Sequence, residues 1–455
     1  MHRRWSILGV ALLAVLAGCL GTGGDGEDLD AQSAEDVEER AGLPNVSETV
    51  ERVVQVEDRW SGEPSILALD DGTLLITGAG GFSRYIEDPT DAPGHFGQSY
   101  IWRSTDDGER WDLVDIDTPG PSDEYTPYRN AVPGVEGDLS QDEGGRAYFV
   151  DLSMLASNGV SASDDGGETW LAAQSAAGLP GTDRPWITGA GEDEVYVKYL
   201  QTSTGYRVAR SVDGGQTFLQ DVSIPSCSQA DPALDPGDEL VIPCIGGEDG
   251  ANLSVLTSPT GEAMDWTRTD APDADGPAAN VFPSLSTAGE GQWTFVYSEA
   301  LDGTARVEAM TTTDGGETWS EPVTLSSTNS TAVFPWTSAN EDGTVSVVWY
   351  EARGKAAPGE QDGEWYPMHA SFQFEVNGST LEQAEVTRIT DEPNHEGPIC
   401  VGGLGCVLEG RSDERRLLDF FEVDVDADGV SHVTWTDTTT DVPTIWYGQV
   451  DPAQG

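Results

Sequence analysis

The feature that most constrains the fold is a short pattern, S-x-D-x-G-x-T-W, which spans residues 163–170 and recurs three more times. The other copies span residues 104–111, 211–218 and 312–319, with small changes at the hydroxyl and aromatic positions. The Asp carboxylate can accept hydrogen bonds from backbone N–H groups of a tight turn, and the Gly can adopt positive φ where the chain reverses. Four copies indicate a repeated structural unit rather than a ligand site. The aspartates expected to form these turns are Asp106, Asp165, Asp213 and Asp314.

A second repeat surrounds the first. It is an entry, usually containing a proline, into an apolar strand, followed by a turn and a second β-run. Seven copies align at Pro64, Asp138, Pro185, Pro232, Pro283, Pro335 and Phe420. Short β-runs and turns fill residues 50–450 without a convincing amphipathic helix, so the sequence predicts an all-β, seven-bladed β-propeller of four-stranded antiparallel blades. The last unit lacks an outer strand, and the run 53–57 is expected to supply it and close the ring.

The repeated turn pattern resembles the Asp-box, or BNR repeat, of the sialidase-like β-propellers. The resemblance implies structural turns on the face opposite the active site, a ring of six blades as the alternative, and a glycoside hydrolase similar to exo-α-sialidases. The first-blade arginine of that family is replaced here by Glu63, and the nearest similar string is Asp183-Arg184-Pro185-Trp186. Seven-bladed rings with such boxes also serve as non-catalytic binding or assembly scaffolds, and this alternative stays open.

Long connections indicate where a ligand would bind. Residues 80–97, 353–366 and 389–417 all map to the rim where innermost strands begin and second strands end, which we call the entry rim. Paired carboxylates there can act as acid and base in glycoside hydrolysis, and arginines and aromatic rings can hold an anionic sugar. The expected catalytic residues are Asp183, Glu351 and Asp419. The expected substrate-binding residues are Arg84, Arg184, Arg353, Trp365 and Tyr366. Alternatively, these acids belong to a solvated coat that the arginines neutralise.

The N-terminus has the pattern of a lipoprotein signal peptide over residues 1–19, with a basic start, an apolar run and Leu-Ala-Gly-Cys ending at Cys19. Residues 20–50 are acidic and poor in apolar side chains, which predicts a flexible tether. Residues 51–455 would then form the propeller domain. We expect a monomer on the extracellular face of the membrane, anchored only by lipid on Cys19, whose partner is an extracellular carbohydrate or a surface glycoprotein.

Four further cysteines form an even set, as expected outside the cell. Cys227 and Cys244 flank one predicted hairpin, and Cys400 and Cys406 close a short Gly-rich loop, so we expect disulfides 227–244 and 400–406.

A cofactor is not expected. Residues 424–429 match the first half of a Ca²⁺-binding loop, but the twelfth position is Trp435 instead of Glu, so an ordinary hairpin turn is the favoured interpretation.

The chain is strongly acidic, with 81 acidic and 22 basic residues and a net charge of −59. Lys198 and Lys355 are its two lysines. This charge repels nucleic acid and anionic lipid, so neither is an expected partner. The composition resembles that of proteins from extremely halophilic archaea, in which most of these carboxylates would form a salt-adapted surface.

Salt should therefore control stability. In molar salt the Debye length is about 3 Å, so the carboxylates repel one another weakly. Dialysis to millimolar salt should unfold or loosen the domain, as measured by circular dichroism and tryptophan fluorescence. The same unfolding temperature at both salt concentrations would contradict the salt-adapted interpretation of the charge.

Overall fold

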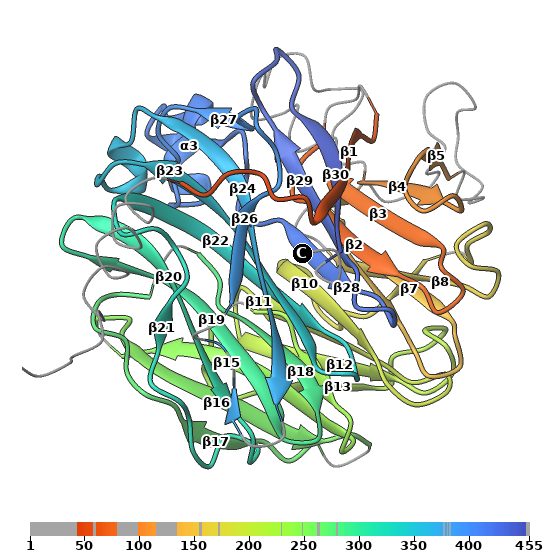
Figure 1. The fold of residues 1–455 in the computed structure, drawn as a ribbon. Helices are drawn as coiled ribbons and strands as arrows, with labels where there is room; N and C mark the ends of the chain where they lie inside the picture. Colours follow the sequence, from red (N-terminus) through yellow and green to blue (C-terminus); the bar gives the residue numbers. More distant parts are fainter. Residues whose placement is uncertain are drawn as a thin grey trace, which may run out of the picture. The chain divides into compact units, whose positions relative to one another are not determined.

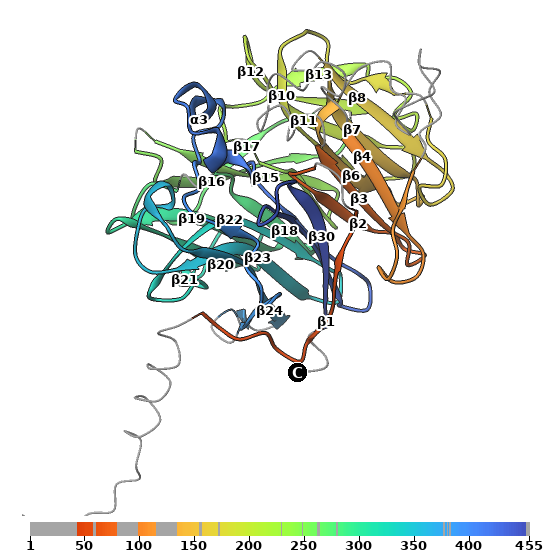
Figure 2. The same cartoon turned by 90° about the horizontal axis from the view of Figure 1, so that it is seen from above.

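Seven four-stranded units surround one axis in the computed structural model (Figures 1 and 2). The structure describes residues 43–57, 61–79, 99–114, 134–153, 157–171, 173–228, 230–247, 249–261, 264–278, 281–375, 378–379, 381 and 384–451. The expected signal peptide, Cys19 and Arg84 lie outside these residues. Five of the sheets keep their four strands in chain order from the axis outward, while blade 6 has extra strands and blade 7 takes its outer strand from the N-terminus. The seven-bladed, all-β prediction is therefore confirmed, and the six-bladed alternative is not observed.

The first four blades follow the chain in order. Blade 1 contains β2 (Ser65–Ala68), β3 (Leu74–Ala79), β4 (Ser99–Ser104) and β5 (Asp112–Leu113). Blade 2 contains β6 (Gly134–Gln141), β7 (Ala147–Ser153), β8 (Ser157–Ser163) and β9 (Gln174–Ser175). Blade 3 contains β10 (Thr182–Gly189), β11 (Val195–Gln201), β12 (Gly205–Ser211) and β13 (Gln220–Ser223). Blade 4 contains β14 (Ala233–Asp235), β15 (Glu239–Gly246), β16 (Asn252–Pro259) and β17 (Thr267–Asp270).

The last three blades carry the additions. Blade 5 contains β18 (Ser284–Gly289), β19 (Gln292–Leu301), β20 (Thr304–Thr312) and β21 (Val323–Thr324). Blade 6 contains β22 (Ser330–Ala339), β23 (Thr344–Arg353), β24 (Glu364–Glu375) and β25 (Gly378–Ser379), and β26 (Glu385–Arg388) and β27 (His395–Glu396) also pair with β24. Blade 7 contains β28 (Glu422–Val425), β29 (Ser431–Asp437), β30 (Thr444–Val450) and β1 (Val50–Gln55). Short helices occur at η1 (Pro358–Glu360), α3 (Leu404–Leu408) and η3 (Ser412–Arg415).

The N-terminal strand closes the ring. Figure 1 shows β1 beside β30, with which it pairs antiparallel from Val50 opposite Val450 to Gln55 opposite Trp446. The closing strand thus begins three residues before the predicted run 53–57. Contacts with the ring begin earlier still, because the Asn45 carbonyl accepts a 3.1 Å hydrogen bond from Thr387 Oγ1 on β26. The edge that blade 7 would otherwise expose is covered.

Buried strands explain the apolar runs of the sequence. Both faces of a blade pack against neighbouring blades, so its middle strands are apolar on both faces and do not alternate with polar residues. In β23, for example, every residue except the last is buried. Val347, Trp349 and Met368 of blade 6 pack there against Val296 and Val307 of blade 5.

Polar side chains join the innermost strands of adjacent blades. Asp138 on β6 accepts hydrogen bonds from Ser65 Oγ of blade 1 at 2.9 Å and from the Ile187 N–H of blade 3 at 2.8 Å. Asp235 of blade 4 accepts one from the Gly291 N–H of blade 5 at 2.8 Å. Part of the acidic surplus is therefore internal structure and not a solvated coat.

Asp424 joins three blades at the closure. It accepts hydrogen bonds from the Ala68 N–H of blade 1 at 2.8 Å and from Ser338 Oγ of blade 6 at 3.0 Å. Asp426 accepts from the N–H groups of Asp428 and Val430, as in a hairpin turn. Residues 426–430 thus form a hairpin turn between β28 and β29. Among the described residues, no three carboxylate, imidazole or thiol groups are placed to hold one metal ion.

The repeated motif forms a turn between the third and fourth strands. Ser163 Oγ donates to Asp165 Oδ1 at 2.9 Å and accepts from the Gly167 N–H at 2.9 Å. Asp165 also accepts from the Thr169 N–H at 2.8 Å, and Gly167 has φ of +78°. The turns at Asp106, Asp213 and Asp314 repeat this geometry. Their place after the third strand puts them on the face opposite the entry rim.

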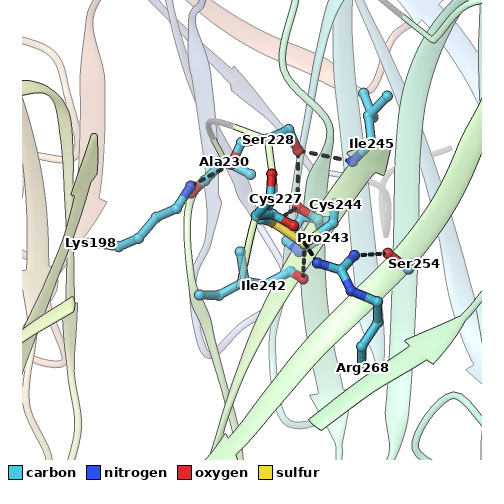
Figure 3. Close-up of a disulfide and its surroundings, with 11 residues drawn as sticks. Lys198, Cys227, Ser228, Ala230, Ile242, Pro243, Cys244, Ile245, Ser254 and Arg268 are labelled. Carbon is cyan, nitrogen blue, oxygen red and sulfur yellow. Dashed lines mark hydrogen bonds between the residues drawn. A yellow bond between two sulfur atoms is a disulfide. The ribbon is translucent and has the colours of Figure 1, made fainter. Parts of the chain in front are cut away.

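Both expected disulfides are confirmed. Cys227 and Cys244 are joined with their Cα atoms 4.9 Å apart, and Cys400 and Cys406 with theirs 6.1 Å apart. Figure 3 shows that the loop following Cys227 is also held by buried Lys198, whose Nζ donates to the carbonyls of Ser228 at 2.9 Å and Ala230 at 2.7 Å. No helix in the described part of the chain combines the length and apolar character needed to cross a membrane.

Asp424→Ala should destabilise the ring because it leaves donors of blades 1 and 6 without their acceptor. We expect a loss of about 3 kcal/mol in the free energy of unfolding, measured with urea at constant molar salt. The matched control is Asp428→Ala in the same hairpin, where the side chain is exposed and the change should stay within about 0.5 kcal/mol. Equal stability of the two variants would show that the closure does not depend on this carboxylate.

Candidate functional site

Charged side chains of four blades meet at the axis on the entry rim. Arg184, at the start of β10, places Nη1 2.8 Å from Glu63 Oε1 and 3.3 Å from Glu136 Oε2, and Nη2 contacts Asp419. Arg415 of η3 also pairs with Asp419, with Nη2 2.9 Å from Oδ2. We call these residues, together with Asp183, the axial charge cluster. Blades 1, 2, 3 and 7 contribute to it, so only closure of the ring brings it together.

Two residues of the axial charge cluster have an unusual backbone conformation. Glu63 and Arg184 have positive φ of 47° and 52°, although side chains disfavour that region, and each precedes a proline. In β10 the pairing register shifts between Asp183 and Trp186, which marks a β-bulge at the strand entry. Phe334 of blade 6 has the same conformation with φ of 58°. The bulge is therefore a recurring feature of blade entries, and its strain alone does not indicate a function.

The carboxyl groups of the axial charge cluster have pKa values that are shifted in opposite directions. Burial raises the pKa of Glu63, Glu136 and Asp183 above their usual values. Burial acts in the same direction on Asp419, but the positive charges of Arg184 and Arg415 outweigh it and lower the pKa of Asp419. Carboxyl groups whose pKa values are pushed apart can divide the roles of acid and base between them.

An aromatic layer lies next to the cluster. The rings of Trp186 and Phe282 are 5.4 Å apart between centroids, and those of Trp336 and Phe420 are stacked at 5.6 Å. The Arg184 guanidinium lies 5.1 Å from the centroid of the Phe282 ring. These side chains come from blades 3, 5, 6 and 7 and are buried, so they form part of the core and not a ligand surface.

A polar hollow of about 450 Å³ opens beside the cluster. We call it the rim hollow. The connection 389–417 and the loop after β29 form its walls, and both belong to the entry rim. Its lining residues are His395, Glu396, Asp413, Arg416, Thr438, Thr439 and Asp441. Its volume lies in the range typical of small-molecule sites.

Hydrogen bonds fix the walls of the rim hollow. Arg416 donates to the carbonyls of Thr438 at 2.8 Å, Thr440 at 2.9 Å and Asp441 at 3.1 Å. His395 Nδ1 lies 2.7 Å from Thr438 Oγ1. Arg415 and Arg416 are adjacent in the chain, and the first belongs to the axial charge cluster while the second lines the rim hollow.

The structure brings three of the predicted residues together. Asp183, Arg184 and Asp419 all belong to the axial charge cluster. Glu351, predicted as a third catalytic carboxylate, is instead fully buried in blade 6 and accepts hydrogen bonds from the Ser327 N–H at 2.8 Å and Trp349 Nε1 at 2.6 Å. Its position on a strand with both faces covered excludes it from the surface.

The predicted substrate-binding residues of blade 6 differ in their exposure. Trp365 is fully buried, with its Nε1 bonded to the Gly397 carbonyl at 2.8 Å, so its ring cannot stack on a ligand, contrary to the prediction. Tyr366 is half-buried and has Arg388 over its ring at 4.9 Å. Arg353 is exposed, and no described carboxylate forms an ion pair with it.

Sequence reasoning did not identify several residues of the site. Glu136, Arg415 and Arg416 were not singled out, although paired arginines in a chain with 22 basic residues form a detectable signal. The hollow also depends on Thr438 and Asp441, which lie in an ordinary-looking turn. Nothing local in the sequence distinguishes them.

Comparisons with known proteins gave distant similarities. No protein-family model and no curated protein matches the chain. An ulvan lyase structure has a TM-score of 0.43 at 14% identity, over 65% of this chain and 79% of that one. An α-L-arabinofuranosidase from Fusarium graminearum has 0.44 at 12%, over 89% and 99%. An intramolecular trans-sialidase from Ruminococcus gnavus has 0.42 at 15%, over 88% and 96%. These values are too low to carry an argument about the site.

The protonation of His395 should be visible in acid stability. Burial, followed by the charge of Arg416, lowers the pKa of His395 to about 4, below the value of about 6.5 for an unfolded chain. The folded state therefore binds fewer protons than the unfolded state, and stability present above pH 6.5 or so is lost as the pH falls toward 4.

Between pH 7 and pH 4.5, His395→Gln should lose about 2 kcal/mol less free energy of unfolding than the unmodified protein. Urea unfolding at both pH values measures this difference. Burial also lowers the pKa of His369, to about 3. Because His369 is present in both proteins, its contribution to the pH dependence cancels in the comparison. Parallel pH dependences would contradict a neutral, buried His395.

Proposed function

We propose that the protein binds extracellular carbohydrate in the rim hollow of blades 6 and 7, while lipid on Cys19 holds it at the outer face of the membrane. The observation that carries this proposal is the chemistry of the hollow. Carboxylates accept hydrogen bonds and threonine hydroxyls both donate and accept them, which matches the mixed donors and acceptors of a sugar, while Arg416 holds the wall of the hollow through backbone carbonyls. The neutral imidazole of His395 adds a group of the same kind.

The position of the hollow supports the proposal. It lies on the rim where the long connections of blade 6 and of the junction of blades 6 and 7 converge, away from the repeated motif turns. The Cys400–Cys406 disulfide and the three carbonyl contacts of Arg416 preorganise its walls, so little ordering is needed when a ligand binds. The part of the expected tether that precedes Asn45 would keep this rim accessible above the membrane.

The test is a glycan array followed by calorimetry in molar salt. Glu396→Gln and Asp441→Asn should weaken binding of the retained sugars by about tenfold or more, because each removes a charged hydrogen-bond acceptor. Asp165→Ala, in a motif turn on the opposite face, should lower stability but leave affinity unchanged. Unchanged affinity of both hollow variants, or loss of affinity in Asp165→Ala alone, would move the site elsewhere.

Glycoside hydrolysis at the axial charge cluster is the second candidate function. The observation that favours it is the separation of pKa values among carboxyl groups at the mouth of the axis. Asp183 is half-buried and less enclosed than Glu63 or Asp419, so it would be the acid that reaches a glycosidic oxygen. Turnover of chromogenic glycosides that disappears in Asp183→Asn would establish it. Binding without turnover would leave a non-catalytic receptor or scaffold.

A further inference from the structure

The cationic groups at the axis are already neutralised. The Arg184 guanidinium contacts carboxylates of Glu63, Glu136 and Asp419. Arg415 is buried at 2% exposure, where it pairs with Asp419 and donates to the Leu418 carbonyl at 2.7 Å. Including Asp183, four carboxyl groups surround two guanidinium groups. An anionic ligand would have to displace carboxylates that the protein itself supplies.

The rim hollow also contains more carboxylates than guanidinium groups. Glu396, Asp413 and Asp441 supply three carboxylates, against the single guanidinium of Arg416. Arg416 in turn spends donors on three backbone carbonyls. Because the ring of His395 is neutral near pH 7, it does not offset the carboxylates. A carboxylate or sulfate entering this hollow would meet like charges at short range, which is the usual basis for rejecting a ligand.

From this arrangement we propose that the entry rim selects neutral and amino sugars and rejects carboxylated or sulfated sugars. The inference rests on the proposed carbohydrate binding and assigns its ligand class. It also reverses the expectation that the rim arginines hold an anionic sugar. Neutral hydroxyls satisfy the carboxylates without added charge, and an ammonium group forms charge-assisted hydrogen bonds with them.

Among the residues that the structure describes, blade 6 provides an alternative site for an anionic ligand. Arg353 and Lys355 are exposed, and no described carboxylate forms an ion pair with either of them. Neither residue lines the rim hollow. Binding of an anionic sugar through these two side chains would therefore occur at a different place, and substitutions distinguish the two.

The experiment compares three probes that share one ring: oligosaccharides of glucose, of glucosamine and of glucuronic acid. Calorimetry is done at pH 7 and at the lowest salt at which circular dichroism shows the folded protein. The glucose and glucosamine series should bind at least about tenfold more tightly than the glucuronic acid series. The combined variant Glu396→Gln, Asp413→Asn should reduce this preference, whereas Asp428→Asn, on the opposite face, should preserve it.

Two results would overturn the inference. One is glucuronic acid binding as tight as glucose binding and lost in Arg353→Gln, which would assign an anionic ligand to blade 6 while leaving carbohydrate binding intact. The other is an unchanged preference in the combined variant, which would mean that the hollow carboxylates do not set it. Absence of binding by all three series and by the wider array would instead overturn the proposed function itself, and the ligand class with it.

Discussion

The ring depends on polar bonds between the innermost strands of adjacent blades. Each of the seven junctions has one: Ser65 with Asp138, Asp138 with the Ile187 N–H, Thr188 with the Pro232 carbonyl, Asp235 with the Gly291 N–H, Ser284 with the Thr337 N–H, Ser338 with Asp424, and Asp424 with the Ala68 N–H. Apolar packing between blades is strong but has little directional preference, whereas these bonds fix the register between neighbours. Because a buried donor left without its acceptor is costly, the loss of one junction affects the closed ring and not a single blade.

Closure of the ring also creates the site. Glu63 and Asp419 are 356 positions apart in the chain, yet the Asp419 N–H donates to Glu63 Oε1 at 3.1 Å. The Arg184 side chain reaches both residues from blade 3, and its guanidinium lies over the buried Phe282 ring. A closely paired guanidinium in such a place contributes to the architecture and has little capacity left for a ligand. For this reason the adjoining hollow, and not the most conspicuous arginine, is the better candidate for binding.

Much of the fold could be predicted from the sequence because each blade is encoded by short sequence patterns that repeat along the chain. The four motif turns and the seven strand entries are short-range patterns, and the closing strand and both disulfides followed from counting what remained unpaired. The site was less accessible, because its members meet only around the ring. Trp365 and Glu351 show the difficulty. Both were correctly assigned to blade 6, but Trp365 was expected in the loop 353–366 and lies in β24, and both side chains are buried between blades. Arg415 and Arg416 are adjacent in sequence and enter different environments, which no local pattern distinguishes.

The acidic residues of this chain fall into two groups, exposed carboxylates and buried carboxylates, which have different roles in the structure. Exposed carboxylates such as Asp428 add to self-repulsion and are relieved by salt, whereas Asp138 and Asp235 are 4% and 3% exposed and hold blades together by accepting hydrogen bonds. Salt screens charges in solvent far better than it screens buried groups, so these populations should respond differently to ionic strength. The rim hollow lies between the two cases, because three carboxylates and the Arg416 guanidinium, which is held by backbone carbonyls, line the same solvent-accessible hollow. The proposed discrimination between ligands would depend on charges in direct contact with the ligand, whose effect persists at salt concentrations that remove long-range electrostatic steering.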